Sequence, residues 1–296
     1  MADGTGRWTR PEGRVRIPIP QRGGPCGIVW SVEEGERAAP APETAQDAHI
    51  DVPAGGPDGG PDGGPAGDEA AAAAPPPDVW ASTAPWAMQL AVLDRRPDRP
   101  THLAVCEAAA AAVVTLLADP RARTGEWAPQ VRHWASGPIR KVVRRGRGVK
   151  WAATDDLLAR AGVEVSRRGA TVRAFVPAPV DTIGRELSTL QVGGTQMPEV
   201  GEPAEPVPGG LTIALTPDAD LSTGKAAAQS GHAAHVAWQA MPADARDRWA
   251  ATGWAVSVVL PGAADWRRIA ATWPVSIRDG GFTEVRPGTM TAVAGW

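Results

Sequence analysis

The order of strand, polar turn and Ala-rich helix occurs twice in this chain, and it restricts the possible folds more than any other feature. In the first occurrence, the apolar run MQLAVL at 88–93 precedes a helical segment from about Leu103 to Leu117. In the second, LTIALT at 211–216 precedes a helical segment from about Thr223 to Ala240. Strands that alternate with helices are typical of a mixed or parallel sheet covered by helices. The sequence therefore predicts an α/β protein.

Later segments extend the repeat. TVRAFVP at 171–177 is similar to WAVSVVLP at 254–261, and LQVGGTQ at 190–196 is similar to VSIRDGGFTE at 275–284. The offset between the copies changes along the chain, so we expect an insertion of roughly 35 residues in the first copy. A tandem duplication, which predicts two similar docked lobes, is our interpretation. The alternative is that strand and helix recur by chance, as they do in many α/β chains.

The N-terminal part has a different composition from the rest. The chain contains 34 Gly and 30 Pro, and many of them fall in VPAGGPDGGPDGGPAGDEAAAAAPPP at 52–77. Residues 1–80 carry a net charge of −7, whereas the following residues carry +4. We expect 1–80 to be a disordered acidic tail, and the true start of the protein can lie near Pro85. The mildly basic body suits an anionic partner.

Several classes of protein are excluded by composition. No apolar run approaches the ~20 residues that a membrane-spanning helix needs, and the first residues lack the apolar core of a secretory signal. Cys26 and Cys106 are the two cysteines, too few for a disulfide framework. We therefore expect a cytoplasmic protein without a membrane partner.

A dense group of polar side chains occupies the run DADLSTGKAAAQSGHAAHVAWQAM after the second apolar strand. Ser222 or Thr223 suits the N-cap of the helix, because a hydroxyl can accept a backbone N–H of the first turn. Lys225, Gln229 and His232 then lie on one helix face, within about 60° of each other. A lysine near the positive end of the helix dipole is locally unfavourable, and such unfavourable placements are typical of functional sites. The alternative is a solvent-facing Lys225 and an ordinary histidine.

The pair Gly224-Lys225 does not form a phosphate loop. Ala219 and Ala226 stand where that motif requires Gly and Ser or Thr. Lys225 and the free N–H groups at the helix start can still hold an anion.

Three runs carry a resemblance to a known family. TGKAAAQSGHAA at 223–234, DRWAATGWAVSVVL at 247–260 and IRDGGFTEVRPGTMTAVAG at 277–295 resemble peptidyl-tRNA hydrolases of the second type. That family has a helix opening with G-K and A-Q before H-A, and later a D-[AG]-G-x-T-[QE] loop followed by G-[ST]-x-T. The resemblance covers about 208–296. It departs from the pattern at 216–219, where TPDA replaces a basic residue and Thr-Asp-Leu.

The resemblance implies hydrolysis of the ester that joins a peptide to the terminal ribose of tRNA. It also implies a mixed four-stranded sheet with flanking helices, no metal or other cofactor, and commonly a homodimer. In the first copy Leu103, Glu107, Ala110 and Gly194 stand near the places of Lys225, Gln229, His232 and Asp279. We therefore expect a degenerate lobe at 81–200, a catalytic lobe at 208–296, and a monomer in which the degenerate lobe replaces the dimer partner.

Ester hydrolysis needs a positioned water, a base and positive charge near the developing oxyanion. Lys225 can supply the charge or hold a phosphate near the acceptor end of tRNA. Asp279 can orient or deprotonate the water, or hold His232 in one tautomer, so the general base stays open between these two. Thr283 completes the catalytic candidates. The expected substrate-binding residues are Ser222, Thr223, Gln229, Thr289 and Thr291.

A basic segment, GPIRKVVRRGRGVKW at 137–151, belongs to the expected insertion. Its cations are expected to contact tRNA phosphates, and a solvated surface is the alternative. They are Arg140, Lys141, Arg144, Arg145, Arg147 and Lys150.

Two other functions compete with peptidyl-tRNA hydrolysis. A non-catalytic RNA-binding protein can retain the fold, although it does not need the set Lys225, Gln229, His232, Asp279 and Thr283. An esterase that acts on mischarged aminoacyl-tRNA is the second.

Overall fold

The computed structural model describes residues 78–280 and 284–296. Most of the expected tail at 1–80, and Thr283, lie outside the described residues. The described residues from Val79 onward belong to one compact unit. The first half (79–200) and the second half (208–296) are therefore parts of a single body.

The first half alternates strands and helices, as the sequence predicts. Its elements are β1 (Trp86–Leu93), α1 (His102–Ala118), α2 (Pro120–Arg123), α3 (Ala128–Ala135), β2 (Arg140–Gly146), α4 (Gly148–Ala152), α5 (Asp155–Ala161), β3 (Gly162–Arg167), β4 (Ala170–Phe175), β5 (Ala178–Pro179), α6 (Arg185–Ser188) and β6 (Gln191–Val192).

The second half is shorter. Its elements are β7 (Leu211–Leu215), α7 (Thr223–Ala240), α8 (Ala243–Ala251), β8 (Val256–Val259), α9 (Ala263–Ala270), β9 (Val275–Arg278) and β10 (Met290–Gly295). The helix predicted at 223–240 is confirmed, with Ser222 as its N-cap.

Each half has its own mixed sheet, so the predicted α/β class is confirmed. The second sheet has four strands in the order β8-β7-β10-β9. The first has six, in the order β3-β4-β1-β2-β6 with β5 also paired to β1. The expectation of a four-stranded sheet is therefore wrong for the first half, where the short strands β5 and β6 extend the pairing.

Four strands of each sheet have the same arrangement. β2 is parallel to β1 as β8 is parallel to β7, and β4 is antiparallel to β1 as β10 is antiparallel to β7. β3 and β9 complete the correspondence at the outer edges beyond β4 and β10.

The expected insertion is wrong in this arrangement. The basic segment at 137–151 contains β2, a regular strand beside β1, and not an added segment. The run at 171–177 forms β4, which takes the place of β10 and not that of β8. The error arises because an apolar run predicts a strand without indicating which strand it pairs with.

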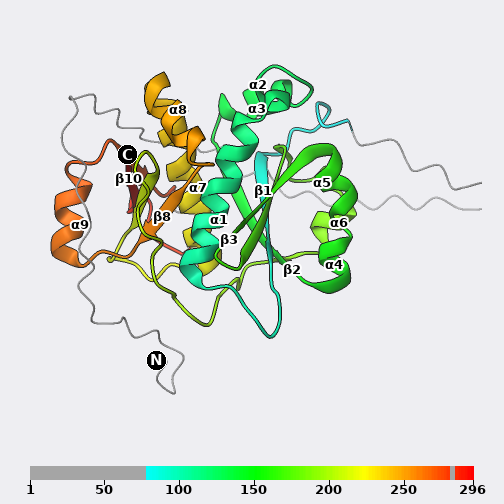
Figure 1. Cartoon of the computed structure of the whole chain (residues 1–296). Coiled ribbons are helices and arrows are strands. Elements are labelled where there is room, and N and C mark those ends of the chain that lie inside the picture. The colour runs from blue at the N-terminus through cyan, green and yellow to red at the C-terminus, as the bar shows by residue number, and fades with distance from the viewer. Residues whose placement is uncertain (1–77, 281–283) are drawn as a thin grey trace, which may run out of the picture. The chain divides into compact units, whose positions relative to one another are not determined.

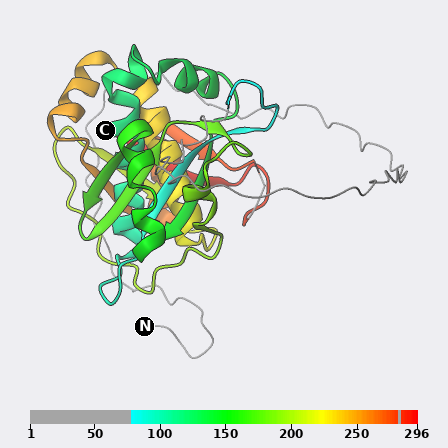
Figure 2. The same ribbon diagram turned by 90° about the vertical axis from the view of Figure 1, so that its right-hand side faces the viewer.

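Helices α1 and α7 lie side by side between the two sheets (Figures 1 and 2). On the far side of the first sheet lie α4, α5 and α6, and beyond the second sheet lies α9. The two central helices contact each other more extensively than any other pair of elements. The resulting order of layers is helices, sheet, two helices, sheet, helix.

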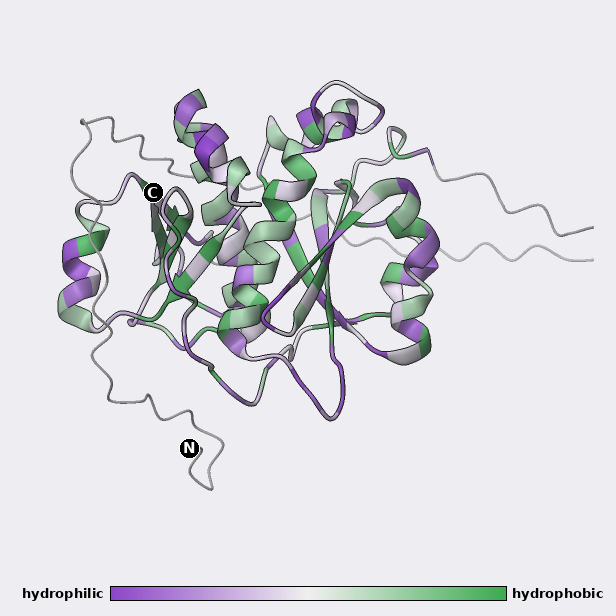
Figure 3. Ribbon diagram, in the orientation of Figure 1, coloured by the Kyte–Doolittle hydropathy of each residue, from purple (hydrophilic) through white to green (hydrophobic). Residues whose placement is uncertain are grey.

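The central position of α1 explains its composition. The run Ala108–Ala112 is fully buried, and most other residues of α1 are also inaccessible. In Figure 3 α1 is green along most of its length, whereas α8 and α9 carry purple bands. Small side chains let a helix touch neighbours on all sides in a close-packed interior. Among residues 78–280 and 284–296, none of the helices combines the length and the hydropathy that a membrane span requires.

Gly231 shows how closely the halves approach. A Cβ atom at this position would lie 3.1 Å from Cγ2 of Val113 on α1 and 3.2 Å from Cδ of Lys141 on β2. These distances are shorter than ordinary van der Waals contact. A side chain at this position of α7 would require Val113 or Lys141 to shift by a few tenths of an ångström.

Glu107 joins the halves by hydrogen bonds. Its side chain is 2% exposed, and Oε1 accepts from the N–H groups of Ala204 at 3.0 Å and Val258 at 3.3 Å. Nη1 of Arg168 donates to Oε2 at 3.2 Å. Val258 belongs to β8, an edge strand of the second sheet. One carboxylate of α1 thus satisfies backbone groups beyond its own half.

We expect Glu107→Ala to lower the free energy of unfolding by about 2–4 kcal/mol, because the buried N–H of Val258 and the half-buried N–H of Ala204 lose their acceptor. Glu107→Gln keeps an acceptor and should lose about half as much. Urea denaturation measures both values. Arg268→Ala, which breaks an exposed pair with Asp265, is the control and should change stability by about 0.5 kcal/mol or less. Equal effects of Glu107→Ala and Arg268→Ala would contradict the role of Glu107.

His102 joins the beginnings of the two central helices. Its Nδ1 lies 3.1 Å from Oγ1 of Thr223, and burial lowers the pKa of His102 from 6.5 to about 4. Between these values the unfolded chain binds a proton that the folded protein excludes. Folding stability therefore falls as the pH decreases through this range.

We expect His102→Asn to remove about 3 kcal/mol of the stability loss between pH 6.5 and pH 4, since asparagine does not titrate. Its amide can still hydrogen bond to Thr223. Urea denaturation of both proteins across this pH range measures the difference, and the carboxylates that titrate there are common to both. Parallel pH profiles would show that folding does not lower the pKa of His102.

Candidate functional site

Three predicted site residues meet where α7 begins. Nζ of Lys225 and Nε2 of Gln229 both donate hydrogen bonds to Oδ2 of Asp279, the latter at 2.7 Å. The side chain of Lys225 is 13% exposed and that of Asp279 is 6% exposed. The fold thus joins one face of α7 to the residue that follows β9.

The local backbone sets this geometry on both sides. Oγ of Ser222 accepts from N–H of Lys225 at 3.2 Å and fixes the start of the helix. The N–H of Asp279 donates to the carbonyl of Thr289 at 2.9 Å, and the carbonyl of Asp279 accepts from the N–H of Gly288 at 2.7 Å. Asp279 is therefore held against the segment that leads into β10.

The electrostatics of the cluster differ from those of a surface ion pair. Lys225 lies in the first turn of α7, where the helix dipole disfavours a cation, and Asp279 compensates this charge. Removing either partner leaves a largely buried charge unpaired, which is strongly destabilising. Oε1 of Gln229, buried beside the pair, has no hydrogen-bond partner among the described residues. A bound water or hydroxyl can satisfy this acceptor.

The N–H groups at the start of α7 are already occupied. Thr223 N–H donates to Oε1 of Gln196 at 3.1 Å, and Gly224 N–H donates to the carbonyl of Thr195 at 2.9 Å. The expectation that these groups hold an anion is therefore wrong. Thr195 and Gln196, which precede the second half, therefore take the place of a ligand at the start of α7.

Thr223, expected to bind substrate, is fully buried. Its hydroxyl accepts from N–H of Met197 at 3.0 Å, in addition to its contact with His102. Thr291 is also fully buried and donates to the carbonyl of Ile277 at 3.3 Å. Both hydroxyls are buried and hydrogen bonded within the fold, which argues against the expectation that they bind substrate.

His232 lies apart from the cluster, at the contact between α7 and β2. Nζ of Lys141 lies 3.3 Å from Nδ1 of His232 and 3.4 Å from Nδ1 of His235. Burial, followed by the nearby charge of Lys141, holds the pKa of both histidines well below its ordinary value. Trp134 stacks on His235 and lies beneath the Lys141 ammonium group. Helix periodicity therefore predicts correctly that Lys225 lies with Gln229, but the expectation that His232 joins them is wrong, because His232 contacts Lys141.

The predicted basic residues divide into three groups. Lys141 and Arg144 are buried, and Nε of Arg144 donates to Oε1 of Gln89 at 2.8 Å. Arg140 is half-buried at the beginning of β2. Arg145, Arg147 and Lys150 line a pocket at the end of β2. The buried pair is inaccessible to tRNA, which corrects the expectation for Lys141 and Arg144.

Glu284 belongs to the site, although it was not among the residues expected there. Its carboxylate accepts from the N–H of Ser222 at 2.8 Å and from Oγ of the same residue at 2.6 Å. Glu284 therefore anchors the β9–β10 connection to the start of α7. Glu284 occupies the last position of the D-[AG]-G-x-T-[QE] pattern, so the motif could have indicated it. Thr283, beside it, is outside the described residues, and half-buried Thr289 contributes its backbone.

The described residues contain no group of three or more His, Cys, Asp or Glu side chains placed to hold a metal ion. Comparisons with protein-family models, curated proteins and solved structures find no match to this chain.

Proposed function

We propose that the protein is a cytoplasmic ester hydrolase that releases the peptide, or an N-blocked amino acid, from peptidyl-tRNA. The observation that carries this proposal is the convergence of Lys225 and Gln229 on Asp279. A lysine, a carboxylate and an amide with an open acceptor supply the positive charge, the base and the water contact that ester hydrolysis needs. The motifs at 223–234 and 277–295 support tRNA as the carrier.

In the proposed reaction, the water oxygen bonds to the ester carbonyl carbon while Asp279 takes a water proton. Lys225 stabilises the negative charge that develops on the carbonyl oxygen. When the bond to the ribose oxygen breaks, the proton passes from Asp279 to that oxygen. Gln229 orients the water through its open acceptor. Asp279 is the proposed base because it lies beside Lys225, whereas His232 contacts Lys141.

We also propose that the two halves arose by duplication and that the first no longer performs chemistry. The shared strand arrangement supports this. Arg168 follows β3 as Asp279 follows β9, and it pairs with Glu107 in the second turn of α1. The charges are reversed relative to the Lys225–Asp279 pair, and backbone groups of Ala204 and Val258 cover the carboxylate. Arg168 thus takes the place that the sequence comparison gave to Gly194.

Lys225→Gln and Asp279→Asn should each lower turnover by about 10²–10⁴-fold, because they remove charge at the reacting atoms. Release of labelled acetyl-amino acid from N-acetyl-aminoacyl-tRNA measures the rate. Lys225 is largely buried, so stability must be measured alongside activity. Arg267→Ala on the surface of α9 is the control and should retain full turnover.

The alternatives give different results in the same assay. Wild-type protein that binds tRNA without releasing the acyl group would identify a non-catalytic RNA-binding protein. Faster release from unblocked than from N-acetylated aminoacyl-tRNA would identify an esterase for mischarged tRNA. Wild-type turnover in folded Asp279→Asn would overturn the proposed site.

We expect the protein to be a monomer, because α1 and the first sheet already cover the α7 face that a second copy would contact. Light scattering on the full chain should give a mass near 30.7 kDa. A mass twice as large at micromolar concentration would contradict the replacement of a dimer partner by the first half.

A further inference from the structure

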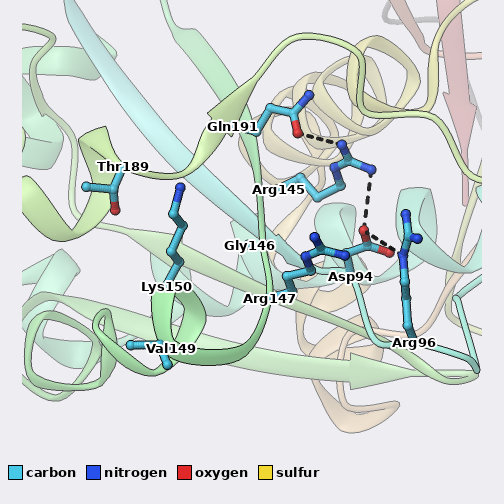
Figure 4. A pocket seen from close by; sticks show the side chains of 9 residues that line it. All are labelled: Asp94, Arg96, Arg145, Gly146, Arg147, Val149, Lys150, Thr189 and Gln191. Carbon is cyan, nitrogen blue, oxygen red and sulfur yellow. Dashed lines mark hydrogen bonds and ion pairs between the residues drawn. The ribbon is translucent and has the colours of Figure 1, made fainter.

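The first half contains a pocket of its own, at the ends of the parallel strands β1 and β2 (Figure 4). Asp94 directly follows β1, and Arg147 directly follows β2. Lys150 of α4 and Gln191 of β6 also line the pocket. The cavity has a volume of about 480 Å³. Adjacent carboxyl ends of parallel strands are a common ligand position in α/β proteins.

The pocket carries an excess of positive charge. Arg96, Arg145, Arg147 and Lys150 line it, together with the single carboxylate of Asp94. That carboxylate is already shared, since Arg99 donates to Oδ1 at 2.7 Å and Arg145 to Oδ2 at 3.3 Å.

Two cations of the pocket have no partner in the described part of the chain. No hydrogen bond or ion pair engages the side chain of exposed Arg147 or Lys150 there. Arg145, in contrast, is fixed by Asp94 and by Oε1 of Gln191 at 2.6 Å. Figure 4 shows these contacts as dashed lines. Cations gathered around a cavity repel one another until an anion enters.

The size and rim of the pocket indicate more than a simple ion. Val149 at the rim is 87% exposed and offers an apolar contact for a sugar or base. Forked guanidinium groups and an ammonium group suit the several oxygens of a phosphate. A cavity of this volume can enclose a ligand larger than inorganic phosphate.

The pocket is also tied to the candidate site. Arg99, which binds Asp94, donates from Nη2 to the carbonyl of Gln196 at 3.2 Å. The side chain of Gln196 accepts from N–H of Thr223 at the start of α7. A continuous series of hydrogen bonds therefore fixes the position of the pocket relative to Lys225 and Asp279.

We infer that this pocket is a second ligand site, which binds a nucleotide phosphate. In this proposal the phosphate lies between Arg147 and Lys150, and the hydrogen bond to Asp94 fixes the position of Arg145 beside them. The phosphate belongs either to an RNA backbone or to a free mononucleotide. Phosphate binding is inferred from the residues of the pocket alone. Only the assignment of that phosphate to RNA rests on the proposed function.

The test compares the full-length protein with the double variant Arg147→Ala/Lys150→Ala. Calorimetric titration with AMP and with inorganic phosphate measures binding of free ligands. Fluorescence anisotropy with deacylated tRNA over a range of salt concentrations measures RNA binding. Arg123→Ala/Arg267→Ala removes the same charge from exposed positions on α2 and α9 and is the matched control. Arg144 and Arg145 are left unchanged, because both hold the fold together.

If the phosphate is that of a free nucleotide, AMP binds the wild type and the pocket variant binds it about tenfold more weakly. If it is that of RNA, the pocket variant reduces the salt slope of tRNA binding by up to ~1.8, at ~0.9 per lost contact. The control should match the wild type in both assays.

The inference is overturned if AMP, inorganic phosphate and tRNA all bind the pocket variant as they bind the control, or bind neither protein. Hydrolysis of N-acetyl-aminoacyl-adenosine separates this outcome from failure of the proposed function. That minimal substrate depends on Lys225 and Asp279, and the pocket variant should cleave it normally. If the wild-type protein shows no esterase activity but the pocket variant loses AMP binding, the second ligand site is supported and the proposed function is not.

Discussion

The close packing of α1 against α7 is the contact on which the rest of the structure depends. Both helices are buried between two sheets, and each can enter this space only because most of its side chains are small. Gly231 marks the point of closest approach to the first half. Since this interface is buried and closely packed, its polar groups must find partners within it. Glu107 and His102 do so across the boundary between the halves.

The same interface decides which polar residues of α7 are available for chemistry. The first half occupies the N–H groups at the helix start and surrounds His232 and His235. Of the polar residues predicted on this face of α7, Lys225 and Gln229 instead donate hydrogen bonds to Asp279 of the second half. The first half therefore limits the candidate site as well as supporting it.

Local patterns predicted β1, α1, β7 and α7, because a strand and a helix differ in the period of their apolar residues. The α7 boundaries and the Ser222 cap follow from capping chemistry in a short stretch of sequence. The pairing of strands did not follow in the same way. Run 140–146 carries four cationic residues and run 171–177 is mostly apolar, yet both lie beside β1, because strand pairing depends on contacts between residues far apart in the chain.

The sequence by itself determined the α/β class, the two central helices and the conjunction of Lys225 and Gln229 on one helix face. Only the tertiary structure decided that Asp279 joins them, that His232 contacts Lys141, and that the basic segment is divided between the interior and a pocket. The physical reason is that helix periodicity fixes neighbours within one element. Burial and partners across elements depend on how the two halves dock.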